Sequence, residues 1–271
     1  MIKLNEMNHF DKITSRENTR LANVRRIRDG KAEDEIFIEG RRLVEEALRS
    51  KLAISGCFVS DEFDGSDLID EITERGIEVS LVASRLFSSI CDTKTPQGII
   101  VTATCPSAGK VRIETRIRSR RLPLVLYLKE VNNPSNLGAV MRTAEAADVA
   151  GVVISARSAD AFSPKSIRAS MGAVFRIPVW EGAEFSELTA WAEQNGLIVT
   201  ASDVSAEKSY TEIDWKFPRL LVIGSEAHGL DAGELASVAE KILIPMANGV
   251  ESLNLAVATA IMVFEAKRQN G

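Results

Sequence analysis

The sequence predicts an α/β fold in two domains, for three reasons. Its 271 residues exceed the usual length of a single domain. Short apolar segments alternate with segments of helical periodicity, which is typical of layered α/β proteins. In the second half the apolar segments are runs of Val, Ile and Leu, as expected for strands buried on both faces of a parallel sheet.

The first domain is predicted over residues 1–105, as a small α/β layer. Its first helix is expected to have Ser15 as its N-cap and to end at Gly30. The strands that follow are predicted over residues 35–40, 54–60, 77–83 and 97–105. The helices between them are predicted over residues 41–50, 66–76 and 84–93.

A basic segment over residues 106–120 is predicted to link the two domains. Pro106 interrupts regular structure, and Glu114 is the only acidic residue in the segment. Such a run binds phosphates in nucleic-acid-binding proteins, although a solvated linker has the same composition. A second basic cluster surrounds Arg25 and Arg26. Because the net charge is −5, any contact with nucleic acid is expected to be confined to such clusters.

The second domain is predicted over residues 121–271. Its strands are expected at residues 122–131, 151–155, 175–180, 197–204, 219–226 and 241–247. Its helices are expected at residues 137–149, 164–174, 185–196, 231–239 and 252–269. This alternation predicts a parallel sheet with crossover helices.

Composition argues against several classes of protein. No apolar stretch approaches the ~20 residues needed to span a bilayer. The polar N-terminal residues lack the apolar centre of a signal peptide. Cys57, Cys91 and Cys105 form no CxxC pair, so neither a zinc site nor a disulfide framework is predicted. A cytoplasmic protein with reduced thiols is therefore expected.

Three polar or glycine-containing segments each follow a predicted strand of the second domain. They are NNPSNLGAVMR at 132–142, IGSEAHGL at 223–230 and IPMANGVESLNLA at 244–256. Carboxyl ends of parallel strands share one edge of a sheet, where open α/β sheets bind ligands, so the segments are expected to converge on one site. The sequence has no GxxxxGK[ST] and no GxGxxG, which argues against a P-loop and against a dinucleotide site.

In order and spacing, these segments resemble the three motifs of the SpoU (TrmH) family of RNA ribose methyltransferases, part of the SPOUT superfamily. The matching residues are Asn133, Pro134, Asn136, Gly138 and Arg142, then Gly224, Glu226 and Gly229, then Ile244, Pro245, Met246, Ser252, Leu253 and Asn254. The segments FIEGRRLVEEAL and TKTPQGI also resemble the N-terminal substrate-binding domain common in this family.

This resemblance implies a fold, a cofactor and partners. Residues 121–271 would form a Rossmann-like parallel sheet whose C-terminal part is threaded into a deep trefoil knot, preceded by the α/β substrate-binding domain. The cofactor would be S-adenosylmethionine and the substrate RNA. The active unit would be a homodimer packed through the knotted domains, with no membrane partner and no metal.

The resemblance also implies catalytic residues. These are Asn136, Arg142, Glu226, Ser252 and Asn254. A guanidinium does not readily lose its proton, so we expect Arg142 to clamp a phosphate or stabilise charge, which leaves the general base open. The structural alternatives are an ion pair of Arg142 with Glu145, a helix-capping role for Glu226, and N-capping of the last helix by Ser252 or Asn254.

Binding residues are implied in the same way. Those for S-adenosylmethionine are Ala201, Gly224, Ile244, Met246 and Leu253, whose apolar members would also suit a plain core. The candidate RNA contacts are Lys165 and Arg168, together with Arg25 and Arg26 of the N-terminal basic cluster. His228 occupies a variable position of the second motif and is given no role.

The implied reaction is methylation of a ribose 2′-hydroxyl. Ribosomal (23S) RNA is favoured because transfer-RNA members often lack the N-terminal domain, an argument by family analogy. A transfer-RNA 2′-O-methyltransferase and a catalytically silent RNA-binding relative are the alternatives. Intact Asn136, Arg142, Glu226 and Asn254 argue against the silent relative, and the missing GxGxxG argues against a nucleotide-dependent oxidoreductase.

Overall fold

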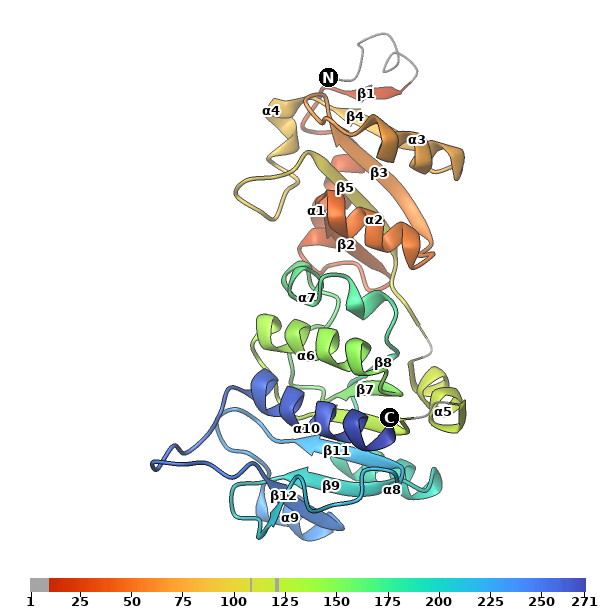
Figure 1. Cartoon of the computed structure of the whole chain (residues 1–271). Helices are drawn as coiled ribbons and strands as arrows, with labels where there is room; N and C mark the ends of the chain where they lie inside the picture. Colours follow the sequence, from red (N-terminus) through yellow and green to blue (C-terminus); the bar gives the residue numbers. More distant parts are fainter. Residues whose placement is uncertain (1–9, 108, 120–121) are drawn as a thin grey trace. The chain divides into compact units, whose positions relative to one another are not determined.

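The computed structural model describes residues 10–107, 109–119 and 122–271 and divides the chain into two compact units (Figure 1). Unit 1 takes in the described residues up to Pro106 together with Phe162–Phe175. Unit 2 takes in the described residues from Ser107 to Ala161 together with Arg176–Gly271. Both units are α/β layers, as predicted. No helix among the described residues is long and apolar enough to cross a membrane.

Unit 1 is built on a mixed five-stranded sheet with the strand order β1-β4-β3-β5-β2. The strands are β1 (Asp11–Ile13), β2 (Glu35–Glu39), β3 (Ile54–Ser60), β4 (Val79–Val82) and β5 (Ile99–Thr104). Strands β1, β4 and β3 run parallel, whereas β5 runs antiparallel to β3 and β2. Strand β1 was not predicted, because three residues are too few to show an alternating pattern.

The helices of unit 1 are α1 (Thr19–Arg28), α2 (Arg41–Arg49), α3 (Ser66–Glu74), α4 (Ser84–Phe87) and α7 (Pro164–Ser170). Helix α1 begins later than predicted, because Asn18 and not Ser15 is its N-cap and accepts a hydrogen bond from the N–H of Arg20. The apolar residues of α1 pack with Phe37 and Phe58 of the sheet in one buried cluster.

The segment that contains α7 was predicted within the second domain but packs in unit 1. Helix α7 contacts β2. Arg168 on this helix pairs with Asp92 at 2.6 Å. A Cβ built on Gly172 would lie 2.9 Å from the Cβ of Glu46, so the chain approaches α2 closely. These contacts join residues far apart in the sequence, which local patterns cannot reveal.

Unit 2 is built on a seven-stranded sheet with the order β10-β12-β9-β11-β6-β7-β8. The strands are β6 (Leu124–Leu128), β7 (Gly151–Ile154), β8 (Val179–Glu181), β9 (Ile198–Ser202), β10 (Lys208–Ser209), β11 (Arg219–Ile223) and β12 (Glu240–Leu243). Every pairing is parallel, which confirms the predicted parallel sheet. The two-residue strand β10 was not predicted.

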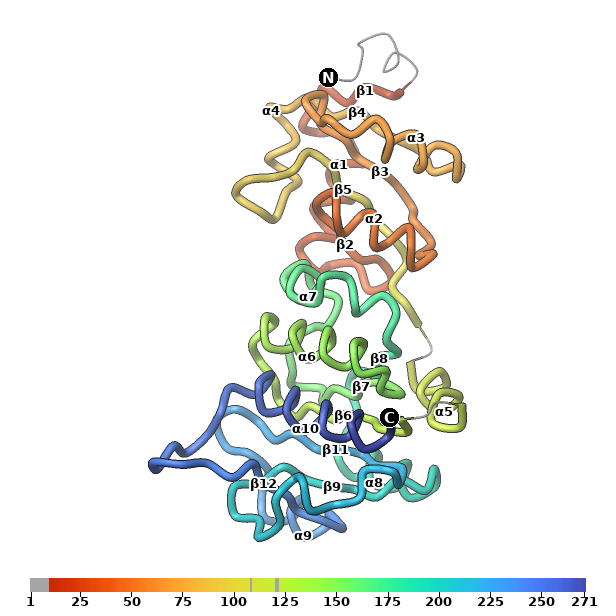
Figure 2. Tube along the Cα trace, viewed as in Figure 1, coloured from red at the N-terminus to blue at the C-terminus, as the bar shows by residue number. Residues whose placement is uncertain are grey.

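The helices of unit 2 are α5 (Gly109–Ser119), α6 (Pro134–Ala147), α8 (Phe185–Gln194), α9 (Ala232–Ser237) and α10 (Leu255–Asn270). Leu188 and Trp191 of α8 and Ile113 of α5 join the sheet residues of one face in a single buried cluster. Helices α6 and α10 pack against each other, as Figure 1 shows. The Cα trace in Figure 2 follows the long connection from β12 to α10.

Residues 109–119 were predicted as part of a basic linker but form helix α5 of unit 2. The helix is anchored by Ile113, which is fully buried. Lys110 pairs with Glu187 at 2.9 Å, and Arg116 pairs with Asp148 at 3.0 Å. These basic side chains therefore serve to attach α5 to unit 2, and fewer of them remain available for phosphates.

Candidate active site

The first polar segment forms the start of α6, directly after β6. Asn133 caps the helix, with its Oδ1 accepting a hydrogen bond from the N–H of Ser135 at 2.9 Å, and Pro134 occupies the first turn. Asn136 lies in this first turn. Arg142 follows six residues later, about 9 Å along the helix axis at ~1.5 Å per residue.

Asn136 connects the three polar segments through its side-chain amide. Its Nδ2 donates a hydrogen bond to the carboxylate of Glu226, in the loop after β11. Its Oδ1 accepts one from Nδ2 of Asn254 at 3.2 Å, at the start of α10. The structure therefore confirms that the three segments converge at one place.

The polarity of this hydrogen-bond chain is determined along its whole length. Oδ1 of Asn254 accepts from the N–H groups of Ala256 and Val257, so its Nδ2 must face Asn136. Oδ1 of Asn136 is then the acceptor, and its Nδ2 must face Glu226. The chain starts at the N–H groups of a helix N-terminus and ends on a carboxylate, an arrangement in which each bond polarises the next.

Arg142 stands apart from this chain and is exposed to solvent. No hydrogen bond or ion pair joins its guanidinium to any residue that the structure describes. The alternative pairing with Glu145 is wrong, because Glu145 bonds with Arg176 through both carboxylate oxygens. The charge of Arg142 is therefore available to a ligand.

The second segment folds back on itself between two glycines. Ser225 and Gly229 exchange backbone hydrogen bonds of 3.1 and 3.0 Å. A Cβ on Gly224 would lie 2.6 Å from the carbonyl carbon of Gly229, so this position has no room for a side chain. Glu226, at the exposed tip, caps no helix, because the N-cap of α9 is Asp231. The capping alternative for Glu226 is therefore wrong.

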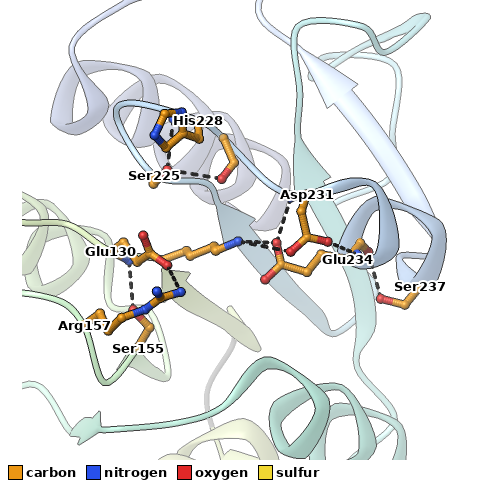
Figure 3. Close-up of polar contacts among 10 residues, drawn as sticks. Glu130, Ser155, Arg157, Ser225, His228, Asp231, Glu234 and Ser237 are labelled. Atoms are coloured by element: carbon orange, nitrogen blue, oxygen red, sulfur yellow. Dashed lines mark hydrogen bonds and ion pairs between the residues drawn. The ribbon is translucent and has the colours of Figure 1, made fainter.

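The loop continues into α9 through a set of local polar contacts (Figure 3). The N–H of His228 donates to Oγ of Ser225 at 3.1 Å. Asp231 and Glu234 form a reciprocal capping box at the start of α9. These contacts hold the loop on the carboxyl side of β11.

Lys129 lies close to the loop after β11 and was not among the predicted site residues. It follows β6 directly, its side chain is 13% exposed, and it pairs with Glu234 and lies 3.7 Å from Asp231. Its position between the first strand of the domain and the Asn-rich segment could have indicated that it lies near the site. Tyr127 lies in β6, two residues before Lys129. Burial raises the pKa of its phenol to about 12, so the phenol stays protonated near neutral pH.

The third segment leaves apolar side chains uncovered. Met246 is 36% exposed and Leu253 is 37% exposed, whereas Ile244 is half-buried. Asn254 is the N-cap of α10, so the capping alternative holds for this residue, whereas Ser252 is exposed and caps none of the described helices. Open apolar side chains fit a ligand with an adenosine part.

Ala201 differs from the other residues predicted to bind the cofactor. It lies inside β9, is fully buried, and belongs to the core cluster between the sheet and α8. Its side chain has no exposed surface with which to contact a ligand, so the plain-core alternative holds for this residue.

The residues predicted to bind RNA lie in unit 1 and differ in availability. Arg25 reaches the carbonyl oxygen of Arg16 at 3.1 Å, and Arg26 bonds with Asn23. Neither makes an ion pair within the described part of the chain. Lys165 is exposed. Arg168 is instead engaged with Asp92, which makes it a poor candidate for a phosphate contact.

No group of three or more His, Cys, Asp or Glu side chains among residues 10–107, 109–119 and 122–271 is arranged to hold a metal ion. The three cysteines are free thiols, and burial raises the pKa of Cys57 and of Cys91 to about 12.

Two family models match the chain. Residues 123–264 match the SpoU rRNA Methylase family, and residues 37–107 match the RNA 2′-O ribose methyltransferase substrate binding family. Among curated proteins, the chain is 32% identical over 234 residues to the 23S rRNA (guanosine(2553)-2′-O)-methyltransferase RlmP of Bacillus subtilis, covering 85% of this chain and 88% of that protein.

Two solved structures from work on RNA methylation are also similar to the chain. An AdoMet-bound rRNA methyltransferase from Sinorhizobium meliloti superposes with a TM-score of 0.80 at 28% identity, covering 96% of this chain and 98% of that one. A structure concerned with 2-OH methylation of C/U34 on tRNA matches with a TM-score of 0.50 at 31% identity, covering 54% of this chain and 95% of that one.

Proposed function

The chain belongs to the SpoU rRNA Methylase family, and we propose that it transfers a methyl group from S-adenosylmethionine to a ribose 2′-hydroxyl of 23S ribosomal RNA. The observation that carries this proposal is the hydrogen-bond chain from Asn254 through Asn136 to Glu226, which brings all three family motifs together. Relatives named as rRNA methyltransferases and an AdoMet-bound neighbour support the reaction and the cofactor.

The residues divide between aligning the acceptor ribose and holding the cofactor. S-adenosylmethionine supplies an electrophilic methyl group on a sulfonium when bound. The protein must orient the 2′-hydroxyl and assist loss of its proton. We assign the phosphate beside the acceptor ribose to Arg142, whose guanidinium is exposed and unpaired within the described residues. The amides of Asn136 and Asn254 and the hydroxyl of Ser252 would orient the ribose.

We assign the cofactor to Gly224, Ile244, Met246 and Leu253. Gly224 offers backbone with no side chain, and Met246 and Leu253 offer open apolar surface. The trefoil knot that family membership implies would close the connection from β12 to α10 around this ligand. Unit 1 would recognise RNA, which the match of residues 37–107 supports, with Arg25, Arg26 and Lys165 as phosphate contacts.

Ribosomal RNA is favoured over transfer RNA by the coverage of the matches. The rRNA methyltransferase from S. meliloti matches 96% of this chain, including the substrate-binding unit. The structure concerned with tRNA methylation matches only 54% of it. Because unit 1 is shared with the rRNA methyltransferase, rRNA is the better candidate substrate.

The test of the function is transfer of labelled methyl groups from S-adenosylmethionine to unmethylated large-subunit rRNA, small-subunit rRNA and tRNA in parallel. We expect incorporation into large-subunit rRNA, recovered as an alkali-resistant dinucleotide, because a 2′-O-methyl group blocks cleavage at that ribose. Incorporation into tRNA alone would contradict the substrate. RNA binding without methyl transfer to any of the three would favour the catalytically silent relative.

We also propose that the active unit is a homodimer formed through unit 2. Most of the large exposed apolar side chains of the described residues lie between Met246 and Phe264. Val257 is 50% exposed and Phe264 is 47% exposed, and their seven-residue spacing places them on one face of α10. Such a concentration of uncovered apolar surface marks an interaction site.

Phe264→Glu is expected to weaken the homodimer about a hundredfold, because it places a charge in a desolvated apolar contact. Sedimentation equilibrium of the full chain measures the dissociation constant. Val204→Glu is the matched control, since Val204 is 71% exposed outside this segment, and it should change the constant less than about twofold. Equal effects of the two substitutions would exclude this face of α10 as the interface.

A further inference from the structure

We propose that unit 1 binds one unpaired nucleotide of the substrate RNA in a cavity at an edge of its sheet. The cavity has a volume of about 470 Å³ and lies wholly within unit 1. Ser60 ends β3, Ser84 follows β4 and Gly98 precedes the antiparallel β5, so these lining residues share one edge. This inference rests on the proposed function, because it names where the RNA would dock.

The size and walls of the cavity suit a nucleobase with its ribose. Ligand sites in proteins usually occupy about 300–1,000 Å³. Phe63, Phe87 and Pro96 provide apolar wall, as a flat base requires. RNA-binding proteins commonly take up single-stranded bases in this way, because splayed bases expose their edges to hydrogen bonding.

The polar groups of the cavity suit a base edge better than a phosphate. Oε1 of Gln97 accepts from the N–H of Arg41 at 2.9 Å, which orients the amide. Its Nε2 donates to no described residue and can donate to a ligand. Ser88 adds an exposed hydroxyl. The guanidinium of Arg41 is already paired with Glu45 and Asp67. The acids Glu62 and Asp64 also line the cavity and would repel an anion.

The loop that carries Pro96 and Gln97 is held from two sides. Arg28 donates to the carbonyl oxygens of Ser89 and Cys91, each at 3.1 Å. The buried carboxylate of Glu39 accepts from the N–H groups of Asp92 and Thr93 at 2.7 and 3.1 Å.

Arg168 adds a third support to this loop through its ion pair with Asp92. Because the loop is already ordered, it loses little conformational entropy when a ligand binds, which favours binding. The buried Glu39 and the engaged Arg168 thus gain a role in positioning the cavity wall.

Three cations that are neighbours of lining residues along the chain would take the flanking phosphates. Arg42, Arg85 and Lys94 are exposed and make no ion pair within the described residues. Arg42 and Arg85 directly follow the lining residues Arg41 and Ser84, and Lys94 lies two residues before Pro96. The donors of Gln97 and Ser88 in the cavity, with unpaired cations next to it in the sequence, match a nucleotide whose base enters the cavity and whose phosphates stay at its rim.

The first test blocks the cavity in the full chain. Ser88→Trp fills it, and the Ser88 hydroxyl makes no hydrogen bond with the described residues; Ser107→Trp is the matched control at an exposed serine that does not line it. The probes are fluorescein-labelled 12-nucleotide oligoribouridylate and oligoriboadenylate and a duplex of the same length, followed by anisotropy. We expect Ser88→Trp to weaken binding of one or both single strands at least tenfold, and Ser107→Trp to change it less than twofold.

Unchanged binding by folded Ser88→Trp, verified by its thermal melting, would overturn the proposal. Preference of the wild-type chain for the duplex would also overturn it. UMP and AMP are added as competitors, and either one binding as tightly as its oligomer would assign the cavity to a free nucleotide instead of RNA.

The second test removes the rim charges. The triple variant Arg42→Gln, Arg85→Gln, Lys94→Gln should lower the slope of log Kd against log salt by about 2, since each single-strand phosphate contact contributes ~0.7. Lys51→Asn is the control, because Lys51 is exposed, lies outside the cavity and has φ 55°, a conformation that Asn accepts. An unchanged slope in the triple variant would contradict the rim assignment.

These outcomes are distinguishable from failure of the proposed function. Wild-type methyl transfer to large-subunit rRNA is measured in the same preparations. Transfer by the wild-type chain together with normal single-strand binding by Ser88→Trp rejects the cavity alone. No transfer by the wild-type chain rejects the function, whatever the binding results.

Discussion

Arg142→Ala is expected to lower the rate of methyl transfer about 10²–10³-fold, the usual loss when one charge-stabilising group is removed. The guanidinium is exposed and bonds to nothing among the described residues, so its loss should change the free energy of unfolding by less than about 0.5 kcal/mol. Binding of S-adenosylmethionine should change less than about twofold, because our assignment gives Arg142 to RNA and not to the cofactor.

Single-turnover methyl transfer, calorimetric titration with S-adenosylmethionine and thermal unfolding together measure this prediction. Arg142→Lys should give an intermediate rate, because lysine keeps the charge and loses the paired donors of the guanidinium. Arg118→Ala is the control, since Arg118 is an exposed arginine on α5. A near-normal rate for Arg142→Ala would remove this residue from the active site.

Gly224→Ala is expected to weaken binding of S-adenosylmethionine tenfold or more. The added methyl group would lie 2.6 and 2.7 Å from two backbone atoms of Gly229 and 3.0 Å from the nitrogen of Leu230. Backbone cannot rotate out of the way as a flexible side chain can, so the loop that carries Glu226 must move. Overpacking of this kind should also cost about 1–3 kcal/mol of stability.

Gly233→Ala is the matched control for this substitution. A Cβ at Gly233 would have Asp231 Oδ1 as its nearest neighbour, at 3.4 Å, and the residue lies in helix α9. The change should therefore stabilise the protein by about 0.5–1 kcal/mol. Titration calorimetry and denaturant unfolding of both variants measure the difference. Normal cofactor affinity in Gly224→Ala would show that the loop after β11 does not hold the cofactor.

Much of the site was accessible from the sequence because its residues sit next to strand ends. The runs ending at Leu128, Ile223 and Leu243 have the composition of buried parallel strands, and parallel strands present their carboxyl ends along one edge. The polar residues that follow each run had to gather there. Asn136, Glu226 and Asn254 are the outcome, joined by hydrogen bonds.

Only the structure shows which residues the charged side chains of α5 and of α7 contact. Helix α5 looked like a charged linker, yet Ile113 is buried and the ion pairs of Lys110 and Arg116 attach it to unit 2. Arg168 looked like a phosphate contact, yet it pairs with Asp92. Charge and periodicity are the same whether a side chain meets water, a ligand or a distant carboxylate, so neither assignment could come from local pattern.

By itself, the sequence determined the order of most elements, the parallel sheet and the place of three polar segments, because these follow from short-range periodicity and from which residues border a strand. Only the tertiary structure decided that residues 162–175 pack in unit 1, that Ala201 is core and that Gln97 lines a cavity. Those features depend on contacts between segments distant in the chain, and such contacts are set by the packing of the whole unit.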